Sequence, residues 1–137
     1  MYQKRNNELR VLGLYLGDYT RKVYLREISV STGIPLKTTQ NTLMALENRH
    51  ILKGVVHGRH KYFTLNINNP QTKLHLLQAE IYRTTLFLQK YPPFKTFLKS
   101  VTTNSTIIVF GSFAKFAVDK NSDLDLFIIA KNEEKLP

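Results

Sequence analysis

The spacing of hydrophobic residues in the first half of the chain predicts three helices. Leucines recur three and four positions apart over about residues 6–17, a helical pattern that ends at Gly17. Similar patterns predict a second helix over Leu25–Thr32 and a third over Lys37–Arg49. Gly33–Pro35 predicts a tight turn between them, because glycine tolerates unusual backbone angles and proline cannot continue a helix.

Two β-like runs and a polar stretch follow the third helix. The runs Ile51–Val56 and Lys61–Asn66 flank His57–His60, which suits the loop of a short hairpin. The stretch Asn66–Thr72 is polar and contains a proline, so we expect it to be a linker.

The second half begins with helical patterns and then changes to strand-like ones. A long amphipathic helix is expected over Lys73–Lys90 and a shorter one over Phe94–Val101. Thr106–Phe110 is a continuous apolar, β-branched run, and Leu124–Ala130 is a second, so both are expected to be buried strands.

These patterns predict an α+β protein in two parts. Residues 1–68 would form one small domain and residues 72–137 a second part, of α/β type. A sheet of only two strands would leave its edges unpaired and its apolar faces uncovered. We expect association with another copy, as a homodimer, to cover them.

The charge of the chain is unevenly distributed. The net charge is +10, and residues 1–70 hold 11 Lys/Arg against four acidic residues. A basic half is the pattern expected of a polyanion-binding module, although solvent-exposed lysines are the simpler alternative. The chain has no cysteine, no apolar stretch of membrane-spanning length and no signal-peptide pattern at its start, so we expect a cytoplasmic protein with no membrane partner.

The order of elements in the first half resembles the winged helix-turn-helix family. The resemblance covers about residues 6–66 and rests on Leu25–Ile28, the turn Ser31–Ile34, Thr38-Thr39 at the start of the third helix, and Gly58–Leu65 as the wing. It implies binding to double-stranded DNA through the third helix and the hairpin tip. The residues expected to contact DNA are Lys37, Thr38, Gln40, Asn41, Arg59, His60 and Lys61. A solvated helix start and an exposed hairpin are the alternatives, and winged helices also bind proteins.

The second half carries two closely spaced acids beside a Gly-Ser pair. The second expected strand opens with Asp123-Leu124-Asp125, and residues two apart on a strand point to the same side, so both carboxylates should face the same way. Neighbouring carboxylates repel unless a cation lies between them, and Mg²⁺ is commonly held by carboxylates and substrate phosphates. Gly111-Ser112 would let a phosphate approach the backbone at the following helix start.

This stretch is similar to the signature of the DNA polymerase β-like nucleotidyltransferase superfamily, and within it to the minimal nucleotidyltransferases. The pattern of strand, Gly-Ser, short helix and Asp-x-Asp appears over residues 107–129. The resemblance implies that Asp123 and Asp125 are catalytic and bind two Mg²⁺ ions. It also implies that the phosphates of an NTP, expected to be ATP, are held by Gly111, Ser112, Lys115 and Ser122.

The sequence departs from the family pattern at two points. Phe116 occupies a position where members usually have glycine. The family's third carboxylate lies on a later strand, and the sequence ends at Pro137, so the domain is expected to be incomplete. Glu133 and Glu134 directly follow the second strand in a helix-start context and are not expected to replace the third carboxylate.

Two functions remain open at this point. In its complete form, the protein would transfer a nucleoside monophosphate from an NTP to an acceptor and release pyrophosphate. The resembling family includes antitoxins that modify a small helical toxin partner, and a winged helix would suit autoregulation at DNA. The alternative is a non-catalytic transcription regulator whose nucleotidyltransferase-like half dimerises or senses nucleotide.

Overall fold

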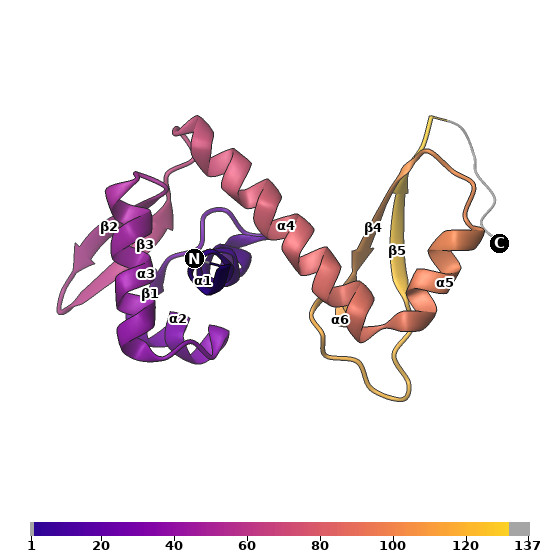
Figure 1. Ribbon diagram of the computed structural model, residues 1–137, viewed down its shortest axis with the longest axis horizontal. Coiled ribbons are helices and arrows are strands. Elements are labelled where there is room, and N and C mark those ends of the chain that lie inside the picture. The colour runs from indigo at the N-terminus through magenta and orange to yellow at the C-terminus, as the bar shows by residue number, and fades with distance from the viewer. Residues whose placement is uncertain (1, 132–137) are drawn as a thin grey trace. The chain divides into compact units, whose positions relative to one another are not determined.

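The computed structural model describes the backbone of residues 2–131 and the side chains from residue 6 onward (Figure 1). It is a mixed α+β structure with two small antiparallel sheets. The chain divides into two compact units, with the division between Arg83 and Thr84. None of the helices within residues 2–131 is both long and apolar enough to cross a membrane.

The first unit contains a helical layer and a three-stranded sheet. Its elements are α1 (Tyr2–Leu12), η1 (Gly13–Tyr15), β1 (Val23–Tyr24), α2 (Leu25–Thr32), α3 (Leu36–Asn48), β2 (Leu52–His57), β3 (His60–Leu65) and the first part of α4 (Pro70–Lys90). The strand order is β1-β3-β2, and both strand pairs are antiparallel. The expected helices and hairpin are therefore present in the expected order.

The first helix differs from its predicted extent. The helical pattern over residues 6–17 covers the end of α1 and the short 3₁₀ turn η1, which begins at Gly13. Glycine is a poor helix former, and the change of helix type at this residue fits that weakness. Gly13 therefore interrupts a pattern that the flanking leucines alone would continue.

The hairpin between β2 and β3 is tighter than the sequence indicates. His57 pairs with His60, which leaves only Gly58 and Arg59 in the turn instead of a four-residue loop. Gly58 has a φ of +61°, and the sharpest two-residue hairpin turns favour glycine at this first position. The tip of the hairpin is thus short and well defined.

A single apolar core holds the first unit together. It is contributed by all three N-terminal helices, the sheet and the start of α4: Leu9, Val11, Leu12, Tyr15, Val23, Ile28, Ile34, Leu43, Leu46, Ile51, Leu52, Phe63, Leu65, Leu76 and Ala79. The Tyr15 hydroxyl is buried and donates a hydrogen bond of 2.9 Å to the Phe63 carbonyl. Burial raises the pKa of Tyr15 well above its ordinary value.

The expected linker is in part the start of α4. This helix begins at Pro70, because proline suits the first helical position, where no backbone N–H is needed. Thr72 is fully buried, and its hydroxyl donates to the Ile51 carbonyl at 3.4 Å. The linker within Asn66–Thr72 is therefore shorter than predicted, and the domain over residues 1–68 stays a prediction.

The second unit contains the rest of α4, α5 (Pro92–Ser100), β4 (Thr106–Phe110), α6 (Gly111–Ala114) and β5 (Asp125–Ile129). The two strands form an antiparallel pair in which Ile108 lies opposite Phe127. Phe87 and Phe94 are its buried aromatic side chains.

The prediction of two buried strands is wrong. Along one face of the β4–β5 sheet, Ile108, Phe110, Phe127 and Ile129 are between 43% and 58% exposed. This exposure agrees with the expectation that a sheet of only two strands leaves an apolar face uncovered. The apolar runs therefore indicated strands correctly, but they did not indicate burial of both faces.

Candidate functional site

Gly111 and Asp125 lie directly against each other where β4 and β5 meet α6. Asp125 is the first residue of β5 and pairs with Phe110, the last residue of β4. Gly111 follows with a φ of +69°, and a Cβ added to it would overlap the Asp125 carboxylate. Glycine is therefore favoured at this position for two reasons: the φ is positive, and the Asp125 carboxylate leaves no room for a Cβ. The structure brings together two of the residues that the sequence indicated.

Asp123 is placed differently from the prediction. Because β5 begins only at Asp125, Asp123 lies in the preceding loop, and the alternation of side chains along a strand does not apply to it. Asp123 is exposed, whereas Asp125 is partly buried. The two carboxylates therefore differ in environment although they are two residues apart.

A turn organised by Asp119 shapes the loop that leads to Asp123. The Asp119 carboxylate accepts hydrogen bonds from the Asn121 backbone N–H at 2.8 Å and from the Ser122 hydroxyl at 3.1 Å. In return, the Asp119 N–H donates to the Ser122 Oγ at 2.9 Å. Ser122, expected at the nucleotide, thus stabilises the loop. The sequence reasoning missed Asp119, although a cluster of Asp, Asn and Ser over a few residues is a common turn signal.

Ser112 and Lys115 lie on either end of the short helix α6. Ser112 is partly buried, and its carbonyl accepts a hydrogen bond of 3.0 Å from the Ala117 N–H. Lys115 is exposed and follows the last residue of α6. Both therefore lie close in sequence to Gly111, with the Lys115 ammonium accessible to an anion.

Phe116 adopts the backbone conformation that glycine favours. Its φ is +57°, in the left-handed region. Its ring is stacked on Tyr91 with centroids 6.1 Å apart, meets Phe87 edge to face at 6.1 Å, and has the Lys90 Nζ 5.3 Å from its centroid. Aromatic and cation–π contacts thus hold a strained residue in place.

The carboxylates at this site have the chemistry to bind a hard cation. Within the described residues, neither Asp123 nor Asp125 forms an ion pair with a basic side chain. Residues 2–131 contain no group of three or more potential metal ligands. Asp125, and Asp123 if the loop brings it to the same ion, would supply carboxylate oxygens to a Mg²⁺ bound together with nucleotide phosphates.

The comparison with protein families bears on this half of the chain. Residues 93–136 match the family model of the Nucleotidyltransferase domain, and the match covers β4, α6 and β5. The C-terminal part carries a nucleotidyltransferase domain. The match also spans Glu133 and Glu134, which lie outside the described residues.

No curated protein matches the chain. Among solved structures, the crystal structure of AF1382 from Archaeoglobus fulgidus is similar, with 17% sequence identity and a TM-score of 0.48. The similarity covers 62% of this chain and 90% of that chain.

Outside the nucleotidyltransferase domain, the expected DNA-contacting residues of α3 lie largely on one exposed face. Lys37, Gln40 and Asn41 are exposed, and the Lys37 ammonium donates to the Gln40 side-chain carbonyl at 3.4 Å. Thr38 is partly buried, and its carbonyl accepts a hydrogen bond of 2.8 Å from the Thr42 hydroxyl. Three of the four helix residues are therefore accessible to a ligand.

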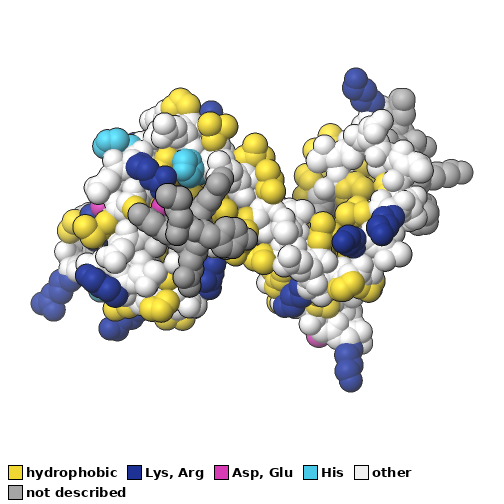
Figure 2. Space-filling model, in the orientation of Figure 1, with side chains coloured by type: hydrophobic (Ala, Val, Ile, Leu, Met, Phe, Trp, Pro, Cys, Tyr) yellow, Lys and Arg dark blue, Asp and Glu magenta, His cyan; other side chains and the backbone are white. Residues whose placement is uncertain are grey.

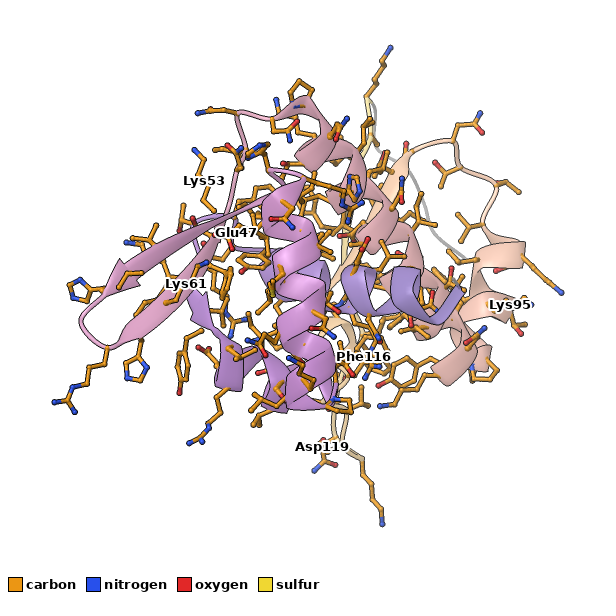
Figure 3. All side chains as sticks on the ribbon, turned by 60° about the vertical axis from the view of Figure 1, so that its left-hand side comes forward. Glu47, Lys53, Lys61, Lys95, Phe116 and Asp119 are labelled. Atoms are coloured by element: carbon orange, nitrogen blue, oxygen red, sulfur yellow. The ribbon has the colours of Figure 1, made fainter. Side chains whose placement is uncertain are left out.

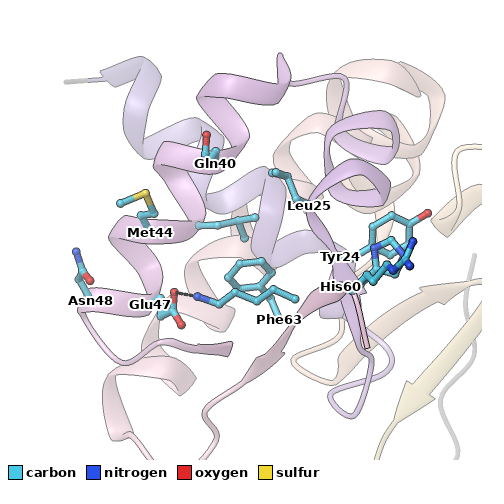
Figure 4. Close-up of a pocket in the computed structure, with 11 residues that line it drawn as sticks. Tyr24, Leu25, Gln40, Met44, Glu47, Asn48, His60 and Phe63 are labelled. Carbon is cyan, nitrogen blue, oxygen red and sulfur yellow. Dashed lines mark hydrogen bonds and ion pairs between the residues drawn. The ribbon is translucent and has the colours of Figure 1, made fainter. Parts of the chain in front are cut away.

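The hairpin and α3 together line a pocket of about 470 Å³ (Figure 4). Arg59 and His60 from the hairpin are exposed along it, and the His60 ring lies 5.5 Å from that of Tyr24. The remaining lining residues come from β1, α2, α3 and β3: Tyr24, Leu25, Gln40, Leu43, Met44, Glu47, Asn48, Lys61 and Phe63. Of the predicted residues, Gln40 of α3 and Arg59, His60 and Lys61 of the hairpin line this groove, whereas Lys37, Thr38 and Asn41 do not.

Lys61, expected at DNA, is engaged within the protein. Its Nζ lies 2.7 Å from the Glu47 carboxylate on α3 (Figure 3). A Cβ added to Gly54 on β2 would overlap both side chains. The Lys61 side chain therefore passes over β2 at Gly54, which has no side chain to block it. The sequence reasoning missed Glu47 and Gly54, although a glycine inside a strand often marks such a close approach.

Proposed function

We propose that the chain binds double-stranded DNA through its first unit and takes part in nucleotidyl transfer through its second. The observation that carries the second half of this proposal is the contact between Gly111 and the Asp125 carboxylate, within the segment that matches the nucleotidyltransferase domain. In this proposal, an acidic side chain lies beside the backbone that approaches a phosphate.

In this proposal the residues of the second unit position the nucleotide. Gly111 and Ser112 approach the phosphates, and Lys115 neutralises part of their charge. Asp123 and Asp125 hold Mg²⁺, which supplies charge neutralisation to the triphosphate when it is bound. A hydroxyl of the acceptor attacks the α-phosphorus of ATP, the bond to the bridging oxygen breaks, pyrophosphate leaves, and the hydroxyl proton passes to solvent.

Labelled nucleotide tests this activity. The full chain is incubated with Mg²⁺, ATP labelled on the α-phosphate and candidate acceptors, which include a small helical protein partner. We expect label on one acceptor and its loss in Asp125→Ala, while Asp18→Ala, which removes an exposed acid of the first unit, retains it. Calorimetric binding of ATP with Mg²⁺ gives a second readout, and unchanged binding in Asp125→Ala would contradict the assignment.

The DNA-binding half rests on the shared groove of α3 and the hairpin and on the basic surface of the first unit (Figure 2). Lys37→Ala and Arg59→Ala should each weaken binding to duplex DNA and reduce the slope of log affinity against log salt by about one. Lys95→Ala removes an exposed lysine of the second unit and is the matched control. Equal effects of all three variants would indicate unspecific charge attraction.

A non-catalytic regulator is the second candidate. The contact between Gly111 and the Asp125 carboxylate would serve nucleotide sensing without transfer equally well. This function predicts binding of ATP with Mg²⁺ but no labelled acceptor, together with a change in DNA affinity when ATP is added. The two candidates therefore differ in covalent labelling and share the requirement for Asp125.

A further inference from the structure

Helix α4 carries apolar residues on two opposite faces. One face packs into the core of the first unit through Leu76 and Ala79, which are 7% and 0% exposed. On the other face, Leu74, Leu77 and Ile81 are 60%, 59% and 59% exposed. Figure 2 shows hydrophobic side chains along the surface that α4 forms. A solvated helix normally has one apolar face, so the second needs its own explanation.

The exposed residues follow the spacing of a helix-packing seam. Leu74, Leu77 and Ile81 are separated by three and then four positions, which is the repeat by which two helices bury a shared stripe. We propose that this face of α4 binds the same face of a second copy of the chain, with the two helices antiparallel.

Charges beside the seam favour this partner and this orientation. Lys73 and Glu80 are exposed and stand seven residues apart, on the same edge of the stripe. When Leu74 of each copy packs against Leu77 of the other, antiparallel helices bring Lys73 of each copy opposite Glu80 of the other. Flanking charges of this kind set partner and orientation in paired helices.

Other arrangements lose this match. Parallel helices would place Lys73 opposite Gln78 and Glu80 opposite Thr85 of the second copy, with no opposite charges paired. Moving the antiparallel pairing by one heptad would bring Glu80 of the two copies together, which repels. The face is thus complementary to itself in one orientation, as a two-fold symmetric interface requires. The proposal depends on neither catalysis nor DNA binding.

Oligomeric state tests the proposal. Sedimentation velocity of the full chain over a range of concentrations should show a reversible monomer–dimer equilibrium. Leu77→Glu should shift it to monomer, while Val30→Glu, a change at a 79% exposed position on α2, should leave it unchanged. Circular dichroism of each variant checks that the helices remain folded. A wild-type chain that stays monomeric at the highest concentration, or that binds only a different protein, would overturn the proposal.

Charge exchange tests the orientation. Lys73→Glu and Glu80→Lys should each raise the dissociation constant of the dimer about tenfold, because each puts like charges together at two symmetric places. The double variant Lys73→Glu/Glu80→Lys should restore the wild-type dissociation constant. If the double variant does not restore association, the antiparallel pairing is wrong. This conclusion holds even if Leu77→Glu disrupts the dimer.

Discussion

The Lys61 ammonium lies 2.7 Å from the Glu47 carboxylate and so links the hairpin to the third helix. The pair is half exposed, so its own contribution to stability is small, within about 1 kcal/mol. Its larger effect is on the position of the positive charge of Lys61. While it is paired with Glu47, Lys61 is held away from any phosphate at the hairpin tip.

Gly54→Ala should release Lys61 without damaging the sheet. The new Cβ would displace only the ends of the Lys61 and Glu47 side chains, so we expect the free energy of unfolding to change by less than about 1 kcal/mol. The freed lysine should strengthen binding to duplex DNA and steepen its salt dependence by about one. Measured affinities at several salt concentrations check this, and Gly54→Ala combined with Lys61→Met should lose the gain.

Gly111→Ala should destabilise the second unit more than backbone strain alone explains. An alanine at a φ of +69° costs about 1–2 kcal/mol, and its Cβ would also overlap the Asp125 carboxylate. Gly58→Ala is the matched control, because Gly58 has a φ of +61° and nothing within 4 Å of the added atom. Hydrogen exchange measures the loss of local stability in each variant, in β4 and β5 for Gly111→Ala and in β2 and β3 for Gly58→Ala. Equal losses would contradict the carboxylate contact.

Replacements of Phe116 should separate its backbone strain from its ring contacts. Phe116→Ala keeps the φ of +57° and removes the ring, so we expect a clear loss of stability. Phe116→Gly removes the same ring but relieves the strain, and should be more stable than the alanine variant by about 1 kcal/mol. Urea unfolding compares the two variants. An alanine variant that is the more stable of the pair would show that this residue carries no left-handed strain.

Tyr15 should make the first unit sensitive to alkaline pH. The phenol of the unfolded chain ionises near its ordinary pKa of 10.0, whereas burial keeps the folded phenol protonated. The unfolded state therefore loses its proton first, and stability falls as the pH rises past 10.0. Tyr15→Phe should lose about 1 kcal/mol at neutral pH with the hydrogen bond to Phe63, but show a shallower alkaline decline. Urea midpoints at neutral and alkaline pH test both effects.

Elements with strong local patterns were predictable from the sequence. Leu25–Thr32 and Thr106–Phe110 have the predicted bounds, because the hydrophobic spacing of each agrees with its residue preferences. The Gly111–Asp125 neighbourhood was predictable in part, since Gly-Ser and Asp-x-Asp lie on adjoining elements. The placement of Asp123 was not, because Asp123 lies in the loop before β5, directly after a turn held by hydrogen bonds of Asp119.

Contacts between distant residues could not be predicted in the same way. The pairing of Lys61 with Glu47 depends on how the hairpin lies on α3, and a glycine in a strand has several explanations. Likewise, the conformation of Phe116 depends on the rings of Phe87 and Tyr91, which are distant in sequence. Periodicity identifies which face of an element is apolar, but not whether another element covers it.

The exposed apolar face of the β4–β5 sheet has a consequence for the behaviour of concentrated solutions. With a net charge of +10, the molecules repel each other at low ionic strength, and this repulsion opposes contact between their apolar faces. Added salt shortens the range of the repulsion to about 3 Å at 1 M and leaves the hydrophobic attraction in place. Concentrated solutions should therefore stay clear in dilute buffer and become turbid as salt is raised.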